Sequence, residues 1–365
     1  MKSKKKKLVI VCGNLSSGGA ERVISVLSDR LLDSFEYIEI LTWREGAVFY
    51  QFNSHIKITS IISANRSNNI LSNIYWFRKY ILKMEPYAVL SFLAPFNILT
   101  RFSLLRTSIP VLVADRNDPV YDCPNKFWRK VRDYFYSLSS GVCVQTLKNK
   151  EYFSKVIQNK TKVIYNPAFI PEEMIGKALQ VEKKKYIVSI GRLTKQKNHE
   201  LLLNAFERIY QLYPEYQLII YGDGELREFL EQKIKELHLE SIVKLPGARE
   251  DVHSLILDAE VFVLSSDYEG MPNALIEAMC LGLPCISTRV SGATELISNS
   301  KNGLLVDIGD CESLTRLLLY LLENRSKAKE IATEAVKIAN ELNLETIVGK
   351  WVDFIVDSVE KNRKL

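Results

Sequence analysis

The sequence predicts an α/β protein built from two doubly wound parallel-sheet domains. The chain has 365 residues, which is too many for one ordinary hydrophobic core and suggests two domains. Short apolar runs rich in β-branched residues alternate with segments long enough for a helix, a pattern typical of parallel sheets covered by helices on both faces. The alternation stops at residues 162–174, which contain two prolines, and then begins again, so we place the domain junction there.

The N-terminal half is expected to begin with a buried strand within residues 7–14, followed by a glycine loop and a helix over 20–32. Four later runs have the same apolar character, and each is separated from the next by enough chain for a helix. These predicted strands are YIEILTW (37–43), AVLSFL (88–93), PVLVADR (110–116) and GVCVQT (141–146). This order favours a parallel sheet.

The C-terminal half repeats the pattern and ends in long helical segments. Strands are predicted at 184–193, 216–224, 242–247, 284–289 and 303–307, helices at 200–212, 225–239 and 271–282, and a helix running into a strand at 251–266. Two such sheets facing each other would form a cleft, with ligands at the carboxyl ends of the strands.

The composition argues against several classes of protein. The chain is 47% hydrophobic and 25% charged, as expected of a folded protein. No apolar run approaches the roughly 18 to 20 residues that a membrane span needs. The start, MKSKKKKLVIVCGN, has the basic flank of a signal peptide but too short an apolar stretch, so we expect a cytoplasmic protein. Six scattered cysteines without a Cys-x-x-Cys pair, and four histidines without a ligand-like pair, argue against metal sites and disulfides.

The charge is unevenly distributed along the chain. Residues 1–165 carry a net charge of +13 and residues 166–365 a net charge of −7, within a total of +6. A basic half suggests an anionic partner, and the candidates are a membrane surface, a phosphate-bearing substrate or nucleic acid. Nucleic acid is the weakest of these, because no recognised binding module occurs. A solvated basic face without a partner is the alternative.

The stretch SSDYEGMPNALIEAM (265–279) carries the strongest signal for a site. Glu277 lies in an apolar helical segment and Glu269 in the loop before it, although a buried carboxylate costs several kcal/mol unless it is compensated. Pro272 suits the first turn of this helix and Gly282 its end. The free amides and positive dipole end of the helix would point into the cleft and suit a phosphate. The alternative is that Glu277 turns to water.

Another predicted strand end carries two cations. In GRLTKQKN, Arg192 and Lys197 lie five positions apart in a loop, so both side chains can converge on one anion such as a diphosphate. The loop GNLSSGGAER would let a phosphate approach backbone amides at Gly18 and Gly19, but it lacks the G-x-G-x-x-G spacing of a dinucleotide site. The segments YGDGELREFLE and LPGARED could line the same cleft or form ordinary turns.

Six of these stretches occur in an order that resembles glycosyltransferase family 4, including enzymes of bacterial capsule, O-antigen, lipopolysaccharide and lipid-linked glycan synthesis. They are GGAER, GRLTKQKN, GDGELREFLE, LPG, EGMPNALIEAM and GLPCISTRVSGATELI. The resemblance covers essentially the whole second half and, more thinly, the first. The pair Glu269 and Glu277, with seven residues between them, resembles the signature of that family.

The resemblance implies a GT-B architecture, in which two Rossmann-like domains face a cleft. We therefore expect an acceptor-binding domain at residues 1–166, a nucleotide-sugar donor domain at 167–345, and a C-terminal helix at 346–365 that packs back on the first domain. A retaining hexosyltransferase of this family would use a nucleotide-diphosphate sugar without a metal ion or cofactor, and no D-x-D motif occurs. The expected donor is a UDP-hexose or UDP-N-acetylhexosamine, and the expected acceptor is a glycan or a polyprenyl-linked glycan.

Matching residues to the family pattern assigns the donor site. Arg192 and Lys197 would hold the leaving diphosphate, helped by the loop at Gly18 and Gly19. Glu277 would take the ribose hydroxyls, and Arg249 would frame the base. The donor sugar would be gripped by Glu269 together with the residues at the helix start, which are Gly270, Met271, Pro272 and Asn273.

The N-terminal domain departs from the family pattern at one position. Many relatives have a histidine near the reacting sugar, whereas VLVADRNDP places Arg116 there, and an arginine cannot act as a base at neutral pH. Deprotonation of the acceptor would then fall to Asp115, to Asp118 or to the phosphate of the donor. The catalytic candidates are therefore Asp115, Arg116, Glu269, Arg192 and Lys197. The alternative is that residues 115–118 form a simple turn before Pro119.

Segments 73–83 and 125–138 mix aromatic residues with Arg and Lys, which suits an anionic membrane surface. We therefore expect the protein to be peripheral on the inner face of the cell membrane. The alternative is that the aromatic residues are core and the cations solvated. Two other functions stay open: a sugar-nucleotide epimerase of similar two-domain fold, and a non-catalytic sugar-nucleotide binder.

Overall fold

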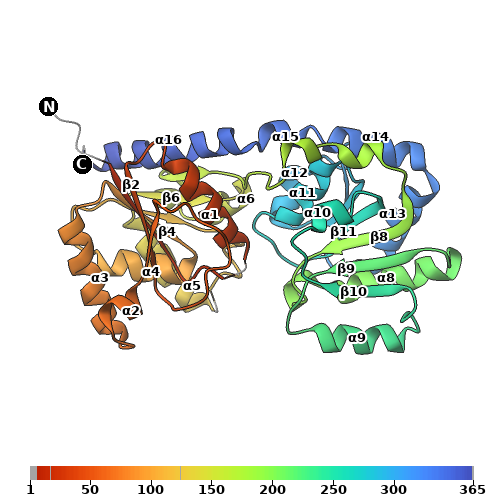
Figure 1. The fold of residues 1–365 in the computed structure, drawn as a ribbon, viewed down its shortest axis with the longest axis horizontal. Helices are drawn as coiled ribbons and strands as arrows, with labels where there is room; N and C mark the ends of the chain where they lie inside the picture. The colour runs from red at the N-terminus through yellow and green to blue at the C-terminus, as the bar shows by residue number, and fades with distance from the viewer. Residues whose placement is uncertain (1–5, 17, 124, 364–365) are drawn as a thin grey trace. The chain divides into compact units, whose positions relative to one another are not determined.

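The computed structural model describes residues 6–16, 18–123 and 125–363. The chain divides into two units, Met1–Pro167 together with Leu344–Leu365, and Ala168–Asn343. Each unit is an open parallel sheet with helices packed on it (Figure 1). The predicted α/β class, with two doubly wound parallel-sheet domains, is therefore confirmed.

The first unit has a seven-stranded sheet in the order β3-β2-β1-β4-β5-β6-β7, with parallel neighbours throughout. The five strands predicted from apolar runs are present. The edge strands β3 and β7 were not predicted, because they are short and carry few buried residues. The strands are β1 (Lys7–Cys12), β2 (Tyr37–Thr42), β3 (Lys57–Ser60), β4 (Ala88–Phe92), β5 (Val111–Ala114), β6 (Gly141–Val144) and β7 (Thr161–Val163).

Two helices of the first unit begin at asparagine caps, which fix where each helix starts. The Asn69 side chain accepts hydrogen bonds from two backbone amides at the start of α3, and Asn125 does the same for α5. The C-terminal helix α16 contacts α1 and β6, and its Trp351 is fully buried with its ring 5.7 Å from that of Phe92. The helices are α1 (Gly19–Leu31), α2 (Ile61–Asn65), α3 (Ile70–Met84), α4 (Ala94–Ser103), α5 (Lys126–Ser137), α6 (Leu147–Tyr152), α7 (Lys155–Gln158) and α16 (Leu344–Arg363).

The second unit has a six-stranded parallel sheet in the order β10-β9-β8-β11-β12-β13. Its strands are β8 (Lys184–Ile190), β9 (Gln217–Tyr221), β10 (Val243–Gly247), β11 (Ala259–Leu264), β12 (Cys285–Thr288) and β13 (Leu304–Val306). Its α-helices are α8 (His199–Leu212), α9 (Arg227–Glu236), α10 (Val252–Leu255), α11 (Asn273–Leu281), α12 (Ser291–Leu296), α13 (Cys311–Glu323), α14 (Arg325–Ala335) and α15 (Ile338–Glu341). Short 3-10 turns are η1 (Glu172–Met174), η2 (Lys177–Gln180) and η3 (Lys195–Lys197).

The strand order of each sheet reverses between two neighbouring strands, β1 and β4 in the first unit and β8 and β11 in the second. In open α/β sheets, ligands bind at the carboxyl ends of the strands at such a switch point. In the second unit the loops there are 191–198, after β8, and 265–272, after β11. Because β8 and β11 are paired in parallel, these two loops leave the sheet side by side.

The length and hydropathy of a helix decide whether it could cross a membrane. The longest described helix, α16, has 20 residues and an amphipathic sequence with buried residues on one side only. Within residues 6–16, 18–123 and 125–363, no helix combines the length and the apolar character that a membrane crossing requires.

Candidate functional site

Helix α11 begins and ends close to the predicted positions. Its first helical residue is Asn273, with Pro272 as the capping residue before it, and it ends at Gly282, which has a φ of +88°. The loop before α11 is packed rather than loose. A Cβ atom on Gly292 of α12 would overlap the carbonyl oxygen of Gly270, so only glycine allows α12 to approach this closely. The start of α11 is therefore held in place by tertiary packing.

Glu269 lies in a network that joins the two switch-point loops. Its side chain is only 9% exposed, and its Oε1 lies 2.5 Å from Nζ of Lys197. Ser266 donates a hydrogen bond from Oγ to the same oxygen at 2.8 Å, and Gln196 donates from Nε2 to Oε2 at 3.2 Å. The structure thus brings together Lys197 and Glu269, two residues that the sequence assigned to one site.

Gln196 and Ser266 are site residues that the sequence analysis did not single out. Both lie inside stretches already identified as strand-end loops, but nothing in the local sequence shows that they contact Glu269. The loops are further bonded to each other through Asn198, whose Nδ2 lies 2.7 Å from Oδ1 of Asp267, and through the backbone amide of Asp267 and the carbonyl of Gln196 at 2.9 Å. These bonds fix the carboxylate and the ammonium group before any ligand binds.

Arg192 lies on the same loop as Lys197 and differs from it in environment. Its side chain is exposed, and no carboxylate in the described part of the chain forms an ion pair with it. The glycine segment that follows the neighbouring strand β9 packs against this loop. Gly222 has a φ of +146°, and a Cβ there would overlap the carbonyl oxygen of Gly191. The stretch YGDGELREFLE therefore supports the cationic loop through its backbone.

His199 follows this loop at the start of α8 and carries no charge near neutral pH. Burial, together with the nearby Lys197 cation, lowers the pKa of His199 to about 4. His199 therefore adds no positive charge to that of Arg192, Lys195 and Lys197 on this loop.

Glu277 is buried, as its apolar surroundings predicted, but its carboxylate has a basic neighbour. The side chain is 5% exposed, and its Oε2 lies 3.0 Å from Nε2 of His253 on α10. His253 was missed in the sequence, where it lies next to the LPGARED segment. The alternative that Glu277 turns to water is excluded by its burial. Arg249, assigned to the base of the donor, is exposed and holds Asp251 through two contacts of 2.9 and 3.0 Å.

The remaining predicted residues belong to the first unit. Gly18 is the capping residue before α1 and Gly19 its first helical residue. Gly18 has an extended backbone, and its carbonyl accepts a hydrogen bond from the Tyr50 hydroxyl at 3.1 Å. The residue before Gly18 lies outside the described residues. A role for this loop in phosphate binding stays a prediction.

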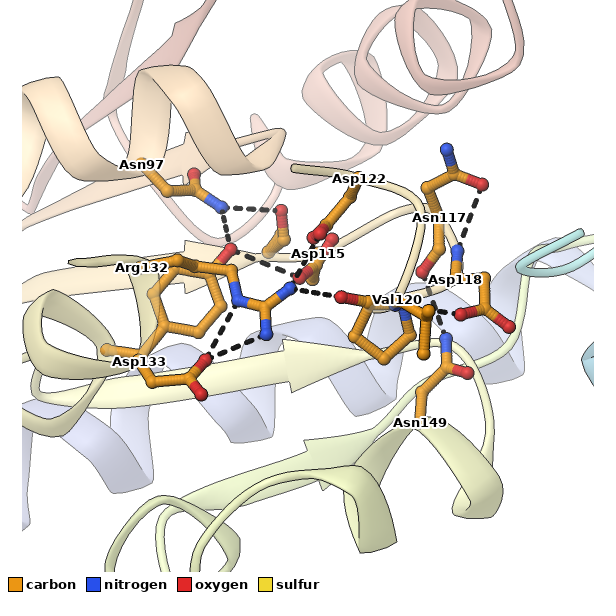
Figure 2. A network of polar contacts seen from close by, with 12 residues as sticks. Asn97, Asp115, Asn117, Asp118, Val120, Asp122, Arg132, Asp133 and Asn149 are labelled. Atoms are coloured by element: carbon orange, nitrogen blue, oxygen red, sulfur yellow. Dashed lines mark hydrogen bonds and ion pairs between the residues drawn. The ribbon is translucent and has the colours of Figure 1, made fainter. Parts of the chain in front are cut away.

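Asp115 and Arg116 follow β5 and are both buried, so they do not form a simple exposed turn. Asp115 is 1% exposed, and its Oδ2 accepts a hydrogen bond from the Tyr136 hydroxyl at 3.2 Å (Figure 2). Arg116 donates from Nη2 to Oδ1 of Asn166 and lies over the Trp351 ring at 5.7 Å. The chain turns only after them, at Pro119, where the Asp118 side chain accepts a hydrogen bond from the backbone amide of Val120 at 2.9 Å.

Arg132 is the centre of the network around Asp115 (Figure 2). Its side chain is fully buried, and its Nη1 lies 2.6 Å from Oδ1 of Asp122. Nη2 lies 2.8 Å from Oδ1 of Asp133, and Nη1 also donates to the carbonyl of Pro119 at 2.5 Å. The guanidinium therefore ties α5 to the loop that follows β5.

Burial changes the protonation of the two carboxyl groups in this network. Burial and the neighbouring Asp115 raise the pKa of Asp122 to about 9, although Arg132 opposes the rise. Burial raises the pKa of Asp115 as well. Because the carboxyl groups of Asp115 and Asp122 interact directly, they share one proton near neutral pH. Asp115 is therefore better suited to a positioning role than to accepting a proton from a substrate, whereas Asp118 is only half-buried.

The aromatic and basic segments of the first unit divide between core and surface. In segment 125–138, Arg132 and Tyr136 are buried, whereas Phe127, Trp128 and Tyr134 are exposed. In segment 73–83, Phe77 and Ile81 are buried, while Tyr75 and Leu82 are exposed. The alternative of core rings therefore holds for Tyr136 and Phe77, whereas Arg132 is not solvated but enclosed by carboxylates and aromatic rings.

Comparison with known proteins agrees with the family that these motifs suggest. The family described as glycosyl transferases group 1 matches residues 171–338. A relative from Campylobacter jejuni, named GalNAc-alpha-(1->4)-GalNAc-alpha-(1->3)-diNAcBac-PP-undecaprenol alpha-1,4-N-acetyl-D-galactosaminyltransferase, is 28% identical over 96% of this chain and 98% of its own length. The amylovoran biosynthesis glycosyltransferase AmsD of Erwinia amylovora is 26% identical over 96% of this chain and 99% of its own length.

Solved structures show the same fold over nearly the whole chain. The structure of Anabaena HepE in complex with UDP has a TM-score of 0.81 at 20% identity, covering 96% of this chain and all of that one. HepE in complex with UDP-glucose has a TM-score of 0.80, also at 20% identity, over 97% and 99% of the two chains. The chain is therefore a glycosyltransferase with the GT-B fold, and its residues 171–338 match the glycosyl transferases group 1, in agreement with its resemblance to glycosyltransferase family 4.

Proposed function

We propose that this protein is a retaining glycosyltransferase that transfers a hexose or N-acetylhexosamine from a UDP-sugar to a lipid-linked glycan acceptor. The observation that carries the proposal is the joining of Lys197 to Glu269 at the switch point of the second sheet, with Arg192 on the same loop. The names of the relatives support the acceptor class, since one acts on an undecaprenol-linked glycan and another serves amylovoran synthesis. HepE, which shares the fold, binds UDP and UDP-glucose.

The residues present fit the chemistry of a diphosphate leaving group. As the bond between sugar and phosphate breaks, the diphosphate gains negative charge and the sugar ring gains positive character. Arg192 and Lys197 stabilise the developing negative charge most strongly in the transition state, which accelerates the reaction. Glu269 accepts hydrogen bonds from the sugar hydroxyls while Lys197 lies between that carboxylate and the diphosphate. Two cations on one loop can serve in place of a divalent ion.

Binding of nucleotides to the purified protein in excess EDTA tests the donor assignment. We expect UDP to raise the melting temperature and GDP and ADP to have little effect, because a ligand that binds only the folded state stabilises it by mass action. At about 100 times its dissociation constant, UDP should add about 2.7 kcal/mol to the free energy of unfolding. A shift with GDP or ADP instead would contradict the UDP assignment, and a shift that needs a divalent ion would contradict metal-free binding.

Transfer assays separate the proposal from its two rivals. A sugar-nucleotide epimerase would convert the UDP-sugar without an acceptor, whereas a transferase needs the acceptor and releases UDP. A non-catalytic binder would keep its function after Glu269→Ala, whereas a transferase would lose turnover. We therefore expect UDP release that depends on the acceptor and on Glu269.

We also propose that the first unit binds an anionic membrane surface, where a lipid-linked acceptor would be held. The helix α5 and the loop before it expose both rings and cations, an arrangement that suits the level of the lipid headgroups. The exposed side chains are Tyr121, Lys126, Phe127, Trp128, Lys130 and Tyr134.

Co-sedimentation with vesicles tests this surface. We expect binding to vesicles containing anionic lipid but not to neutral ones, with weaker binding at high salt because the attraction is screened. Phe127→Ser combined with Trp128→Ser should weaken the binding. The matched control is Leu212→Ser, which removes an equally exposed apolar side chain from the second unit. Equal binding by all three proteins, or binding that salt does not change, would contradict the proposal.

A further inference from the structure

The contact between His253 and Glu277 joins α10 to α11 in the second unit. Both side chains are largely buried, with exposures of 15% for His253 and 5% for Glu277, and the atoms in contact are Nε2 and Oε2 at 3.0 Å. The segment that carries His253 is the same one that carries Arg249, because α10 directly follows the loop after β10. One short segment therefore contacts the carboxylate of Glu277 and also presents the exposed Arg249 guanidinium.

A histidine at this place has a physical consequence for the carboxylate. A buried glutamate without a donor would have a large desolvation penalty, and its rotatable bonds would let the carboxylate adopt several orientations. When His253 donates from Nε2 to Oε2, it satisfies one acceptor position of that oxygen and restricts the rotation of the carboxylate. A ligand that then donates hydrogen bonds to Glu277 binds a group whose orientation has already been set, which reduces the entropy lost on binding.

We propose that His253 is a positioning residue for donor binding, which holds Glu277 in the orientation that accepts hydrogen bonds from the ribose hydroxyls of the nucleotide. The proposal rests on the proposed function, in which Glu277 contacts the ribose. It goes further by assigning a role to a residue of α10 that lies outside the two switch-point loops. It also joins the loop of Arg249, assigned to the base, to the carboxylate assigned to the ribose.

A purely structural role is the competing explanation. Val252, next to His253, is buried, so α10 already has an apolar anchor. If the pair served only to fasten α10 to α11, removing the histidine would lower the stability of the fold. It would then weaken the binding of every nucleotide to the same extent. If the pair positions Glu277, the loss of affinity depends on whether the ligand carries the hydroxyl that donates a hydrogen bond to Glu277.

Calorimetric binding of UDP and 2′-deoxy-UDP to the full chain distinguishes these explanations. His253→Ala should weaken UDP binding about 3- to 12-fold, the loss expected for one ordinary hydrogen bond, and should raise KM for the donor while kcat changes little. The same substitution should weaken 2′-deoxy-UDP binding much less, because two changes that remove parts of one interaction are not additive. His253→Gln, whose amide can still donate, should recover most of the affinity.

The controls separate failure of this proposal from failure of the proposed function. His55→Ala removes an exposed histidine from the first unit and should bind both nucleotides like the parent. If His253→Ala weakens the binding of UDP and of 2′-deoxy-UDP equally, or weakens neither, the positioning role is overturned. A loss of UDP affinity in Glu277→Gln without a loss in His253→Ala overturns only the role of His253. Unchanged UDP affinity in Glu277→Gln overturns both the ribose assignment and the positioning role built on it.

Discussion

Replacing Arg132 with methionine is expected to lower the free energy of unfolding of the first unit by about 3–5 kcal/mol, the range found when one partner of a buried ion pair is removed. Arg132 is fully buried, and its loss leaves Asp122 without the cation that lies 2.6 Å away. The measurement is urea unfolding followed by tryptophan fluorescence. All four tryptophans of the chain, Trp43, Trp76, Trp128 and Trp351, belong to the first unit, so this signal reports on that unit alone.

The loss of stability caused by Arg132→Met should increase as the pH rises. The pKa of Asp122 is raised from 3.8 to about 9, so the folded protein favours its protonated form. The stability that this carboxyl contributes is present below about pH 4 and is lost as the pH rises towards 9. Without Arg132 an ionised Asp122 is compensated even less, so Arg132→Met should cost more at about pH 9.5, where the carboxyl is ionised in the parent, than at pH 5, where it is protonated in both proteins.

Two further variants complete the test of Arg132. Adding Asp122→Asn to Arg132→Met removes the uncompensated charge and should recover part of the lost stability, most clearly at about pH 9.5. Lys130→Met, on the exposed side of the same helix, should leave the unfolding curve close to that of the parent. An equal cost at both pH values, together with no recovery in the double variant, would show that Arg132 contributes packing rather than charge.

Arg192→Gln is expected to lower kcat about 10²- to 10³-fold, the range found when one preorganised donor is removed from a developing negative charge. The guanidinium is exposed and lies on the loop that carries Lys197, so the change should leave the melting temperature almost unaltered. The measurement is the initial rate of acceptor-dependent UDP release. Arg192→Lys keeps the charge but loses the planar fork, and an intermediate rate is expected.

Lys195→Gln is the matched control for Arg192, since it removes an exposed cation from the same loop. Lys195 was not assigned to the site, and its replacement should leave the rate near that of the parent. If both glutamine variants slow the reaction equally, the loop acts through its general positive potential and the specific role of Arg192 is wrong.

Local sequence was sufficient for most elements of the fold. Apolar runs bounded by turn residues predicted the central strands of both sheets, and Pro272 and Gly282 marked the limits of α11. The edge strands β3 and β7 were missed because both are short and carry few buried residues, which leaves no apolar run to detect. The sequence placed Arg132 in an aromatic and basic segment suited to a membrane surface, because the periodicity of a helix does not show which cation meets a carboxylate.

The sequence by itself determined which residue types gather at the strand ends: the cationic loop at Arg192 and Lys197, and the two glutamates around the start of α11. Only the tertiary structure decided how their charges are compensated. Lys197 meets Glu269 because β8 and β11 are neighbours in the sheet, and His253 meets Glu277 because α10 packs against α11. The physical reason is that local propensity depends on adjacent residues, whereas the partner of a buried charge is set by strand order and packing between segments far apart in the chain.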